Sequence, residues 1–137
     1  DLPYPAPVAV TASPADLKRG QTLAHQGDAA LKVPACKSCH GASLTGVQPN
    51  VPGLLGLPLD YLNAQLGAWQ THQRKAVSPD CMSDIVQRLS SEDLVAVATW
   101  LSTQNVPIEA QAALKISAPL KAPWRCGSAP DLSKAQP

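Results

Sequence analysis

The sequence predicts an all-α fold, with three to five helices in one domain. Apolar residues recur at the three- and four-residue spacing of a helix in three segments, near residues 15–26, 59–73 and 90–105. No segment shows the alternation of apolar and polar residues that is typical of a half-buried strand. A chain of 137 residues is most simply one domain, and the helical pattern places that domain at residues 15–106.

Proline-rich segments flank this domain. Residues 1–14 contain four prolines, so we expect an extended arm rather than a helix or a strand. Residues 107–137 are rich in alanine, proline and lysine, which predicts a mostly irregular extension with at most a short helix at 109–115. Cys126 is the residue through which this extension would be tethered to the domain.

The first helix is expected at residues 15–26. Gly20 and Leu23 fall at helical spacing, and Asp16 lies in the first turn or at the N-cap, where an acidic side chain is favoured. The glycine that follows would end the helix. We interpret His25, near that end, as a solvated residue rather than a metal ligand.

The second helix is expected at residues 59–73. Asp60 in its first turn and His72 near its end carry the charges that complement the helix dipole. We interpret Tyr61 and Trp69 as core residues and His72 as a solvated one. The apolar stripe of this helix consists of Leu59, Leu62, Leu66 and Trp69.

The last helix is expected to begin after Ser90, a natural N-cap. Asp93 follows three residues later, in the position of the capping-box acid. Pro107 marks the limit of this helix. Residues 76–89, which precede it, are expected to form a loop around a proline. The buried stripe of the helix consists of Leu94, Val97, Ala98 and Leu101.

The charge balance excludes several classes of partner. Lys and Arg total 11 against 10 for Asp and Glu, and no run of like charges is present. A nucleic-acid or polybasic membrane interface would need clustered positive charge, so we expect neither. No apolar run approaches the ~18–20 residues of a membrane-spanning helix, so no transmembrane segment is expected. The oligomeric state cannot be inferred from these features.

The motif Cys36-Lys37-Ser38-Cys39-His40 is the most informative stretch of the chain. Two thiols at this spacing with a histidine immediately after them are typical of a covalently attached c-type haem. One helical turn would carry both sulfurs to one edge of the porphyrin, and His40 would become an axial iron ligand. A structural zinc site or a redox dithiol also uses two such cysteines, but neither needs the histidine. We therefore expect one haem c, attached through Cys36 and Cys39.

A c-type haem is attached outside the cytoplasm, so we expect a periplasmic protein whose signal peptide is absent from this chain. In an oxidising compartment the two remaining cysteines, Cys81 and Cys126, can form a disulfide, which accounts for all four cysteines. By closing a loop of ~45 residues, this bond could contribute about 3–4 kcal/mol to stability.

The iron ligand opposite His40 can come from several residues. By chemistry, the candidates are Met82, His25, His72 and the thiol of Cys81. Histidine–methionine ligation favours reduced iron and suits electron transfer. A single methionine can also be a core filler, and a Cys81 thiolate would lower the reduction potential. We favour Met82 as the ligand and Cys81 in the disulfide, because Cys126 otherwise has no partner.

With these residues identified, the chain resembles a monohaem class I c-type cytochrome. It is most similar to one haem domain of the dihaem cytochrome c family of bacterial periplasms. The resemblance runs from about Leu17 to Gln104. The segments that carry it are Arg19-Gly20-Gln21, Val33 to Gly41, Val51-Pro52-Gly53-Leu54, Tyr61 to Leu66 and Leu89 to Leu94.

The resemblance implies an all-helical fold in which the first and last helices cross, with Gly20 against Trp100. It implies that Met82 is the axial methionine, because Met82 precedes Leu89 by the family's interval. It also implies that the carbonyl of Pro52 accepts a hydrogen bond from the ligand histidine.

The expected function is electron transfer rather than catalysis. Both axial ligands would stay bound while the iron cycles between the ferric and ferrous states. The electron would pass from a dehydrogenase-type donor to an oxidase or reductase, with this chain as a free carrier or as the cytochrome subunit of an oxidoreductase complex. The alternative is a haem enzyme or a gas or redox sensor with an open or Cys81-ligated iron.

The resemblance also has two departures. Only one haem motif is present, which excludes transfer between two haems within the chain. Neither the arm nor the Cys126-bearing extension has a counterpart in the family. The identity of the redox partners therefore stays open.

Overall fold

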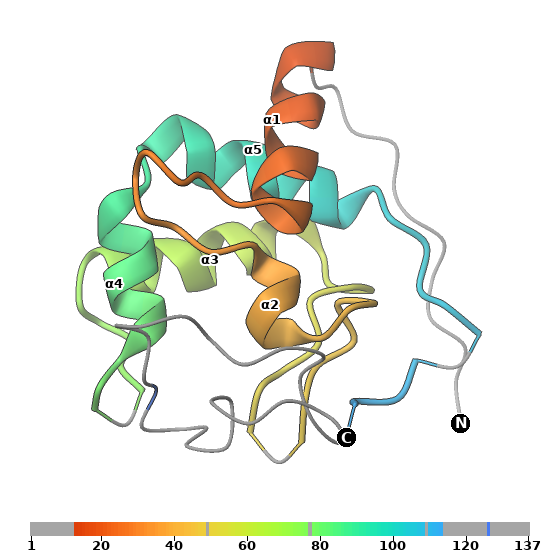
Figure 1. Ribbon diagram of the computed structural model, residues 1–137. Helices are drawn as coiled ribbons and strands as arrows, with labels where there is room; N and C mark the ends of the chain where they lie inside the picture. Colours follow the sequence, from red (N-terminus) through yellow and green to blue (C-terminus); the bar gives the residue numbers. More distant parts are fainter. Residues whose placement is uncertain (1–12, 49, 77, 109, 114–125, 127–137) are drawn as a thin grey trace.

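The computed structural model describes residues 13–48, 50–76, 78–108, 110–113 and 126. Within these residues the fold is built from five helices without a sheet, which confirms the all-α prediction (Figure 1). The predicted arm lies almost entirely outside the described residues, as does most of the predicted extension. In chain order the helices are α1 (Pro14–His25), α2 (Cys36–His40), α3 (Leu59–Gln70), α4 (Cys81–Arg88) and α5 (Ser91–Ser102).

Helix α1 lies close to its predicted position, but Ser13 is its N-cap. The Ser13 hydroxyl accepts a hydrogen bond from the backbone N–H of Asp16 at 3.1 Å. Pro14 follows in the first turn, where a missing N–H costs no helical hydrogen bond. The prediction that His25 is solvated holds only in part, because the side chain is half-buried and its ring packs edge-on against Trp100, with 5.3 Å between the ring centroids.

Helices α1 and α5 cross in close contact at Gly20 (Figure 1). A Cβ atom at this position would lie 2.6 Å from the Cβ of Trp100 and would overlap the backbone carbonyl of Ala96. Only a residue without a side chain lets the two backbones approach this closely. The contact of Gly20 with Trp100 that the family resemblance implies is therefore present.

The hydrophobic core is built around this crossing. Buried residues of α1 and α5 pack there with one leucine from the loop after α2 and one from α3. Every core residue predicted from the stripe of α5 is buried, and all of them except Leu94 belong to this cluster. The buried members of the cluster are Leu23, Ala24, Leu44, Leu62, Val97, Ala98, Trp100 and Leu101.

Helix α3 covers the core with one face. Leu62 is buried, and the other leucines of its stripe are partly buried against the same cluster. The prediction of Tyr61 as a core residue is wrong: Tyr61 is 47% exposed, because it lies about 100° around the helix from Leu62. Trp69 is half-buried, with the guanidinium of Arg74 4.3 Å from its ring centroid. His72 is exposed beyond the end of the helix, as predicted.

The prediction of a loop at residues 76–89 is wrong over its second half, which forms α4. Asp80 caps this helix: one carboxylate oxygen accepts from the N–H of Ser83 at 3.1 Å, and the other accepts from the N–H of Ala76 at 2.8 Å. Val86 is fully buried. The helix spans only eight residues, so its periodicity is too short to stand out in the sequence.

The short helix considered at residues 109–115 is also wrong over the residues described. Residues 110–113 are not helical, and Ala113 forms a parallel β-bridge with Val47. Backbone groups of these residues form hydrogen bonds with the loop after α2, which is distant in the sequence. Local sequence patterns do not reveal such a pairing.

The guanidinium of Arg19 joins three segments of the chain. It binds both carboxylate oxygens of Asp93 on α5, at 2.9 and 3.3 Å, and the carboxylate of Asp28 at 2.9 Å. Asp28 belongs to the connection between α1 and α2. These hydrogen bonds lower the pKa of both Asp28 and Asp93 below the ordinary carboxyl value. The network therefore fixes the start of the segment that leads to the cysteine motif.

We expect Gly20→Ala to destabilise the protein by about 2–3 kcal/mol, because the added methyl group meets backbone atoms that cannot move independently of α5. Gly67 is a matched control, because a Cβ atom there has no neighbour within 4 Å. Gly67→Ala should stabilise the protein by roughly 0.5–1 kcal/mol through helix propensity. Urea unfolding of the two variants measures both effects. Similar effects at the two positions would contradict the close crossing.

We expect the stabilisation from Arg19 to depend on pH. Because Asp28 and Asp93 have lowered pKa values in the folded protein, their contribution is present above a pH of about 4 and is lost as the pH falls through the folded values. The difference in the free energy of unfolding between wild type and Arg19→Gln should therefore shrink below a pH of about 4. Lys18→Gln removes a neighbouring charge and should give a difference that changes little over the same range. Equal pH profiles for the two variants would contradict the network.

Candidate functional site

The motif Cys36–His40 forms α2, a single helical turn that contacts α1. The turn starts where the N–H of Ser38 donates to the carbonyl of Ala35 at 3.0 Å. Cys36 and Cys39 are three positions apart, so their thiols share one side of the turn. Neither thiol takes part in a disulfide. Both sulfurs are thus available on the same side, as covalent attachment of a flat macrocycle requires.

The environment of the two thiols differs from that of a redox dithiol. Burial raises the pKa of Cys36 to about 12 and that of Cys39 to about 11. A reactive Cys-X-X-Cys pair needs the opposite shift, because the thiolate is the attacking species. Among the residues that the structure describes, no group of three or more His, Cys, Asp and Glu side chains is placed to hold a metal ion. These observations disfavour the dithiol and zinc interpretations.

His40 is buried and held in one orientation. Its Nδ1 atom lies 2.8 Å from the carbonyl oxygen of Pro52. A proton on Nδ1 satisfies this carbonyl and leaves Nε2 as the lone-pair donor, which is the usual arrangement of a ligand imidazole. Burial lowers the pKa of His40, which favours the neutral ring that a metal needs. The hydrogen bond that the resemblance implies for Pro52 is therefore present in the structure.

Backbone hydrogen bonds hold the loop that carries Pro52. The N–H of Gly46 donates to the carbonyl of His40 at 2.7 Å, which folds the loop back onto α2. Val47 and Val51 exchange two hydrogen bonds of 2.9 and 3.0 Å in an antiparallel bridge. These hydrogen bonds, which join backbone groups only, place the Pro52 carbonyl. The sequence indicated an irregular loop here, but not this pairing.

An apolar wall of partly buried residues, which includes Cys36, packs against the main core. Cys36 and the set of half-buried leucines beside it in this wall leave part of their surface uncovered. An apolar plate such as a porphyrin would remove this surface from water. Two thiols, an oriented neutral imidazole and an apolar wall together fit a covalently attached haem. The leucines of this set are Leu17, Leu54, Leu55, Leu57, Leu59, Leu66 and Leu89. Leu54, Leu55 and Leu57 lie within four residues after Gly53 and could have been recognised from the sequence.

Met82 is the second residue of α4 and is half-buried. Helix α4 packs against α3, while α2 packs against α1 (Figure 1). The neighbouring Cys81 forms a disulfide with Cys126, with an S–S distance of 2.04 Å. A cysteine in a disulfide has no thiolate to offer to iron. Of the other candidates, His25 packs against Trp100 and His72 is exposed after α3.

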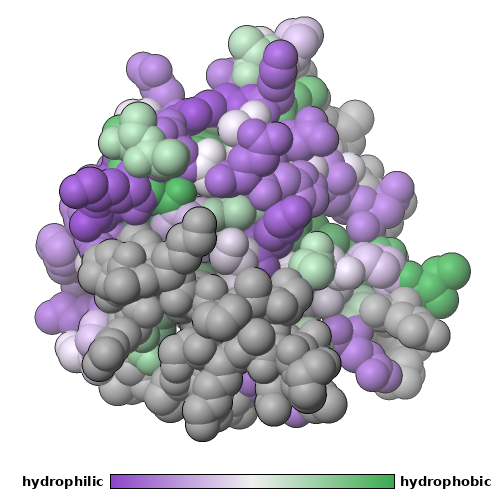
Figure 2. Space-filling model, viewed as in Figure 1, coloured by the Kyte–Doolittle hydropathy of each residue, from purple (hydrophilic) through white to green (hydrophobic). Residues whose placement is uncertain are grey.

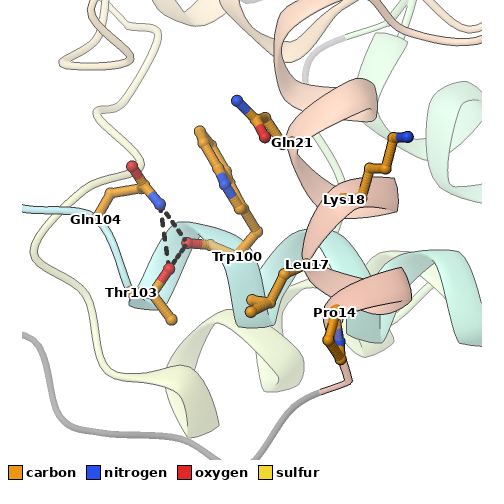
Figure 3. Close-up of a pocket in the computed structure, with 7 residues that line it drawn as sticks. All are labelled: Pro14, Leu17, Lys18, Gln21, Trp100, Thr103 and Gln104. Atoms are coloured by element: carbon orange, nitrogen blue, oxygen red, sulfur yellow. Dashed lines mark hydrogen bonds between the residues drawn. The ribbon is translucent and has the colours of Figure 1, made fainter.

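Elsewhere on the described surface the chemistry differs from that of this site. On the face shown in Figure 2 it is mostly hydrophilic, with hydrophobic residues scattered over it. A shallow groove of about 410 Å³ lies between the start of α1 and the end of α5 (Figure 3). Pro14, Leu17 and Trp100 are among its lining residues, and the lining includes no thiol or imidazole. Within the described residues, no helix has both the length and the apolar character needed to cross a membrane.

Comparison with known proteins agrees with this geometry. A family model described as cytochrome c matches residues 17–105. The "thiosulfate dehydrogenase electron acceptor" of Thiomonas intermedia is 36% identical over 100 residues, which cover 73% of this chain and 45% of that protein. Cytochrome c-554(548) of Halomonas halodenitrificans is 36% identical over 82 residues, which cover 58% of this chain and 99% of that protein.

A solved structure of thiosulfate dehydrogenase from Marichromatium purpuratum has the same fold over most of this chain. The two superpose with a TM-score of 0.64 and 35% sequence identity, over 71% of this chain and 21% of the other. The present chain spans about half the length of the two thiosulfate dehydrogenase electron acceptors that it matches.

Proposed function

This chain belongs to the cytochrome c family, and on that premise we propose that it carries single electrons in the periplasm between a dehydrogenase-type donor and an oxidase or reductase. Its cofactor is haem c, for which Cys36 and Cys39 are present. We assign His40 and Met82 as the axial ligands. The contact between His40 Nδ1 and the Pro52 carbonyl, at 2.8 Å, is the observation that carries the assignment of His40; the assignment of Met82 rests on the family resemblance and on the disulfide that removes the Cys81 thiol.

The bound haem supplies the one-electron redox chemistry, and the residues of this chain set the conditions for it. The Pro52 carbonyl keeps the proton of His40 on Nδ1 and the ring in one rotamer. The apolar wall would bury part of a bound haem, and such burial stabilises the less charged form of a redox centre. The thioether of Met82 is a soft, neutral donor that likewise favours the reduced state.

Two features support a periplasmic location. Attachment of a c-type haem takes place outside the cytoplasm, and the Cys81–Cys126 disulfide suits an oxidising compartment. The names of two relatives make a thiosulfate dehydrogenase the first donor to test. The present chain would accept electrons from such an enzyme either as a free carrier or as its cytochrome subunit.

We expect Met82→Leu to abolish the far-red charge-transfer band that methionine-ligated ferric haem shows, and to lower the reduction potential. Leucine has a similar volume and apolar character, so the fold should be retained. Optical spectra of the ferric protein and a redox titration measure the two effects. His72→Gln, at a candidate ligand that lies exposed after α3, is the control and should keep the band. If the wild type lacks the band, or if Met82→Leu retains it, the assignment of Met82 is wrong.

We expect the association with a redox partner to depend weakly on salt. Lys and Arg exceed Asp and Glu by only one, 11 against 10, so little long-range steering is available. The second-order rate constant for reduction by a thiosulfate dehydrogenase with thiosulfate should change less than about threefold between ~10 mM and ~150 mM salt. Stopped-flow absorbance of the haem measures it. A steep dependence would indicate a charged docking surface, and no reduction at all would exclude this donor.

A further inference from the structure

We propose that the C-terminal extension is a clamp that joins the two axial-ligand segments and so keeps Met82 bound. The clamp consists of residues 111–113, which hold the loop that carries Pro52, and Cys126, which holds the start of α4. This inference rests on the proposed His40–Met82 ligation. It makes Ala113 and Cys126 positioning residues, although they lie beyond residues 17–105, the part matched by the cytochrome c family model.

The first end of the clamp is a set of hydrogen bonds to the loop after α2. The N–H of Ala113 donates to the carbonyl of Gly46 at 2.9 Å, and the N–H of Gln48 donates to the carbonyl of Ala113 at 2.8 Å. The hydroxyl of Thr45 donates to the carbonyl of Gln111 at 2.9 Å. These bonds tie the extension to the same loop that folds back onto the His40 carbonyl.

The second end of the clamp is the disulfide between Cys126 and Cys81. Cys81 is the first residue of α4 and is covalently adjacent to Met82. Any movement of the first turn of α4 away from the site must therefore carry Cys126 with it.

The two ends of the clamp meet in one small apolar cluster. Val47 is 3% exposed and is packed against partly buried residues from two segments of the chain. These are Cys39 and Val51 from the motif and its loop, and Ala113 and Cys126 from the extension. A displacement of Cys126 would thus uncover Val47 and loosen the surroundings of the second haem-attachment cysteine.

The clamp matters because α4 is short and packs mainly on α3. Short surface helices open locally at a lower free-energy cost than the core. A covalent link to a second segment reduces the number of conformations that a detached α4 can adopt. The link therefore lowers the population of the detached state. Detachment of Met82 requires such an opening, so the extension should slow the entry of an external ligand to the iron.

Cyanide binding to the ferric holoprotein at fixed pH tests the clamp, because cyanide occupies the site that Met82 leaves. In Cys81→Ser/Cys126→Ser the rate of cyanide binding should rise roughly tenfold, which corresponds to about 1.4 kcal/mol less free energy of local opening. Ala113→Pro removes the N–H that donates to Gly46 and should also raise the rate. Ala113→Ser keeps that N–H and is its matched control, with a rate close to that of wild type.

A general loss of stability must be separated from a loss of the clamp. Ser13→Ala removes the N-cap hydrogen bond of α1, far along the chain from the clamp, and should leave the rate of cyanide binding unchanged. Unchanged rates in both clamp variants, or an equal rise in Ser13→Ala, would overturn the clamp. If wild-type ferric protein lacks the methionine charge-transfer band, the proposed ligation fails instead. If the band is present and only the rates are unchanged, the clamp alone fails.

Discussion

The close contact of α1 with α5 at Gly20 is the constraint on which the remaining structure depends. It brings Trp100 against the last turn of α1, and it places Arg19 where one guanidinium reaches both Asp93 and Asp28. The connection that contains Asp28 leads directly to the cysteine motif. The position of α2 is therefore set by helix packing some distance away, and a side chain at the crossing would shift the motif together with the helix.

The candidate site itself relies mainly on backbone groups. The imidazole of His40 is oriented by a carbonyl, and the loop that supplies this carbonyl is held mainly by N–H to C=O bonds. Such bonds add order without charge, because their donors and acceptors are neutral groups paired with each other. This suits a centre that gains and loses an electron, since fixed dipoles need little rearrangement between the two oxidation states.

The extension changes how the limits of the domain should be drawn. The family match ends at residue 105, yet Ala113 pairs with Val47 and Cys126 is bonded to the first residue of α4. The described part of the extension therefore belongs physically to the haem-binding domain. In a small domain with few aromatic side chains, a disulfide and a backbone bridge supply order that a larger core would otherwise provide.

The sequence by itself determined the features that depend on local chemistry. The motif Cys36–His40 indicates covalent haem attachment because its spacing matches one helical turn, and the stripes of α1, α3 and α5 follow from their periodicity. Tertiary structure decided what depends on residues distant in the chain. Helix α4 is too short to be recognised from its periodicity, His25 packs against Trp100 of a distant helix, and Tyr61 lies outside the core. The pairing of Ala113 with Val47 joins segments far apart in sequence, and no local pattern encodes such a contact.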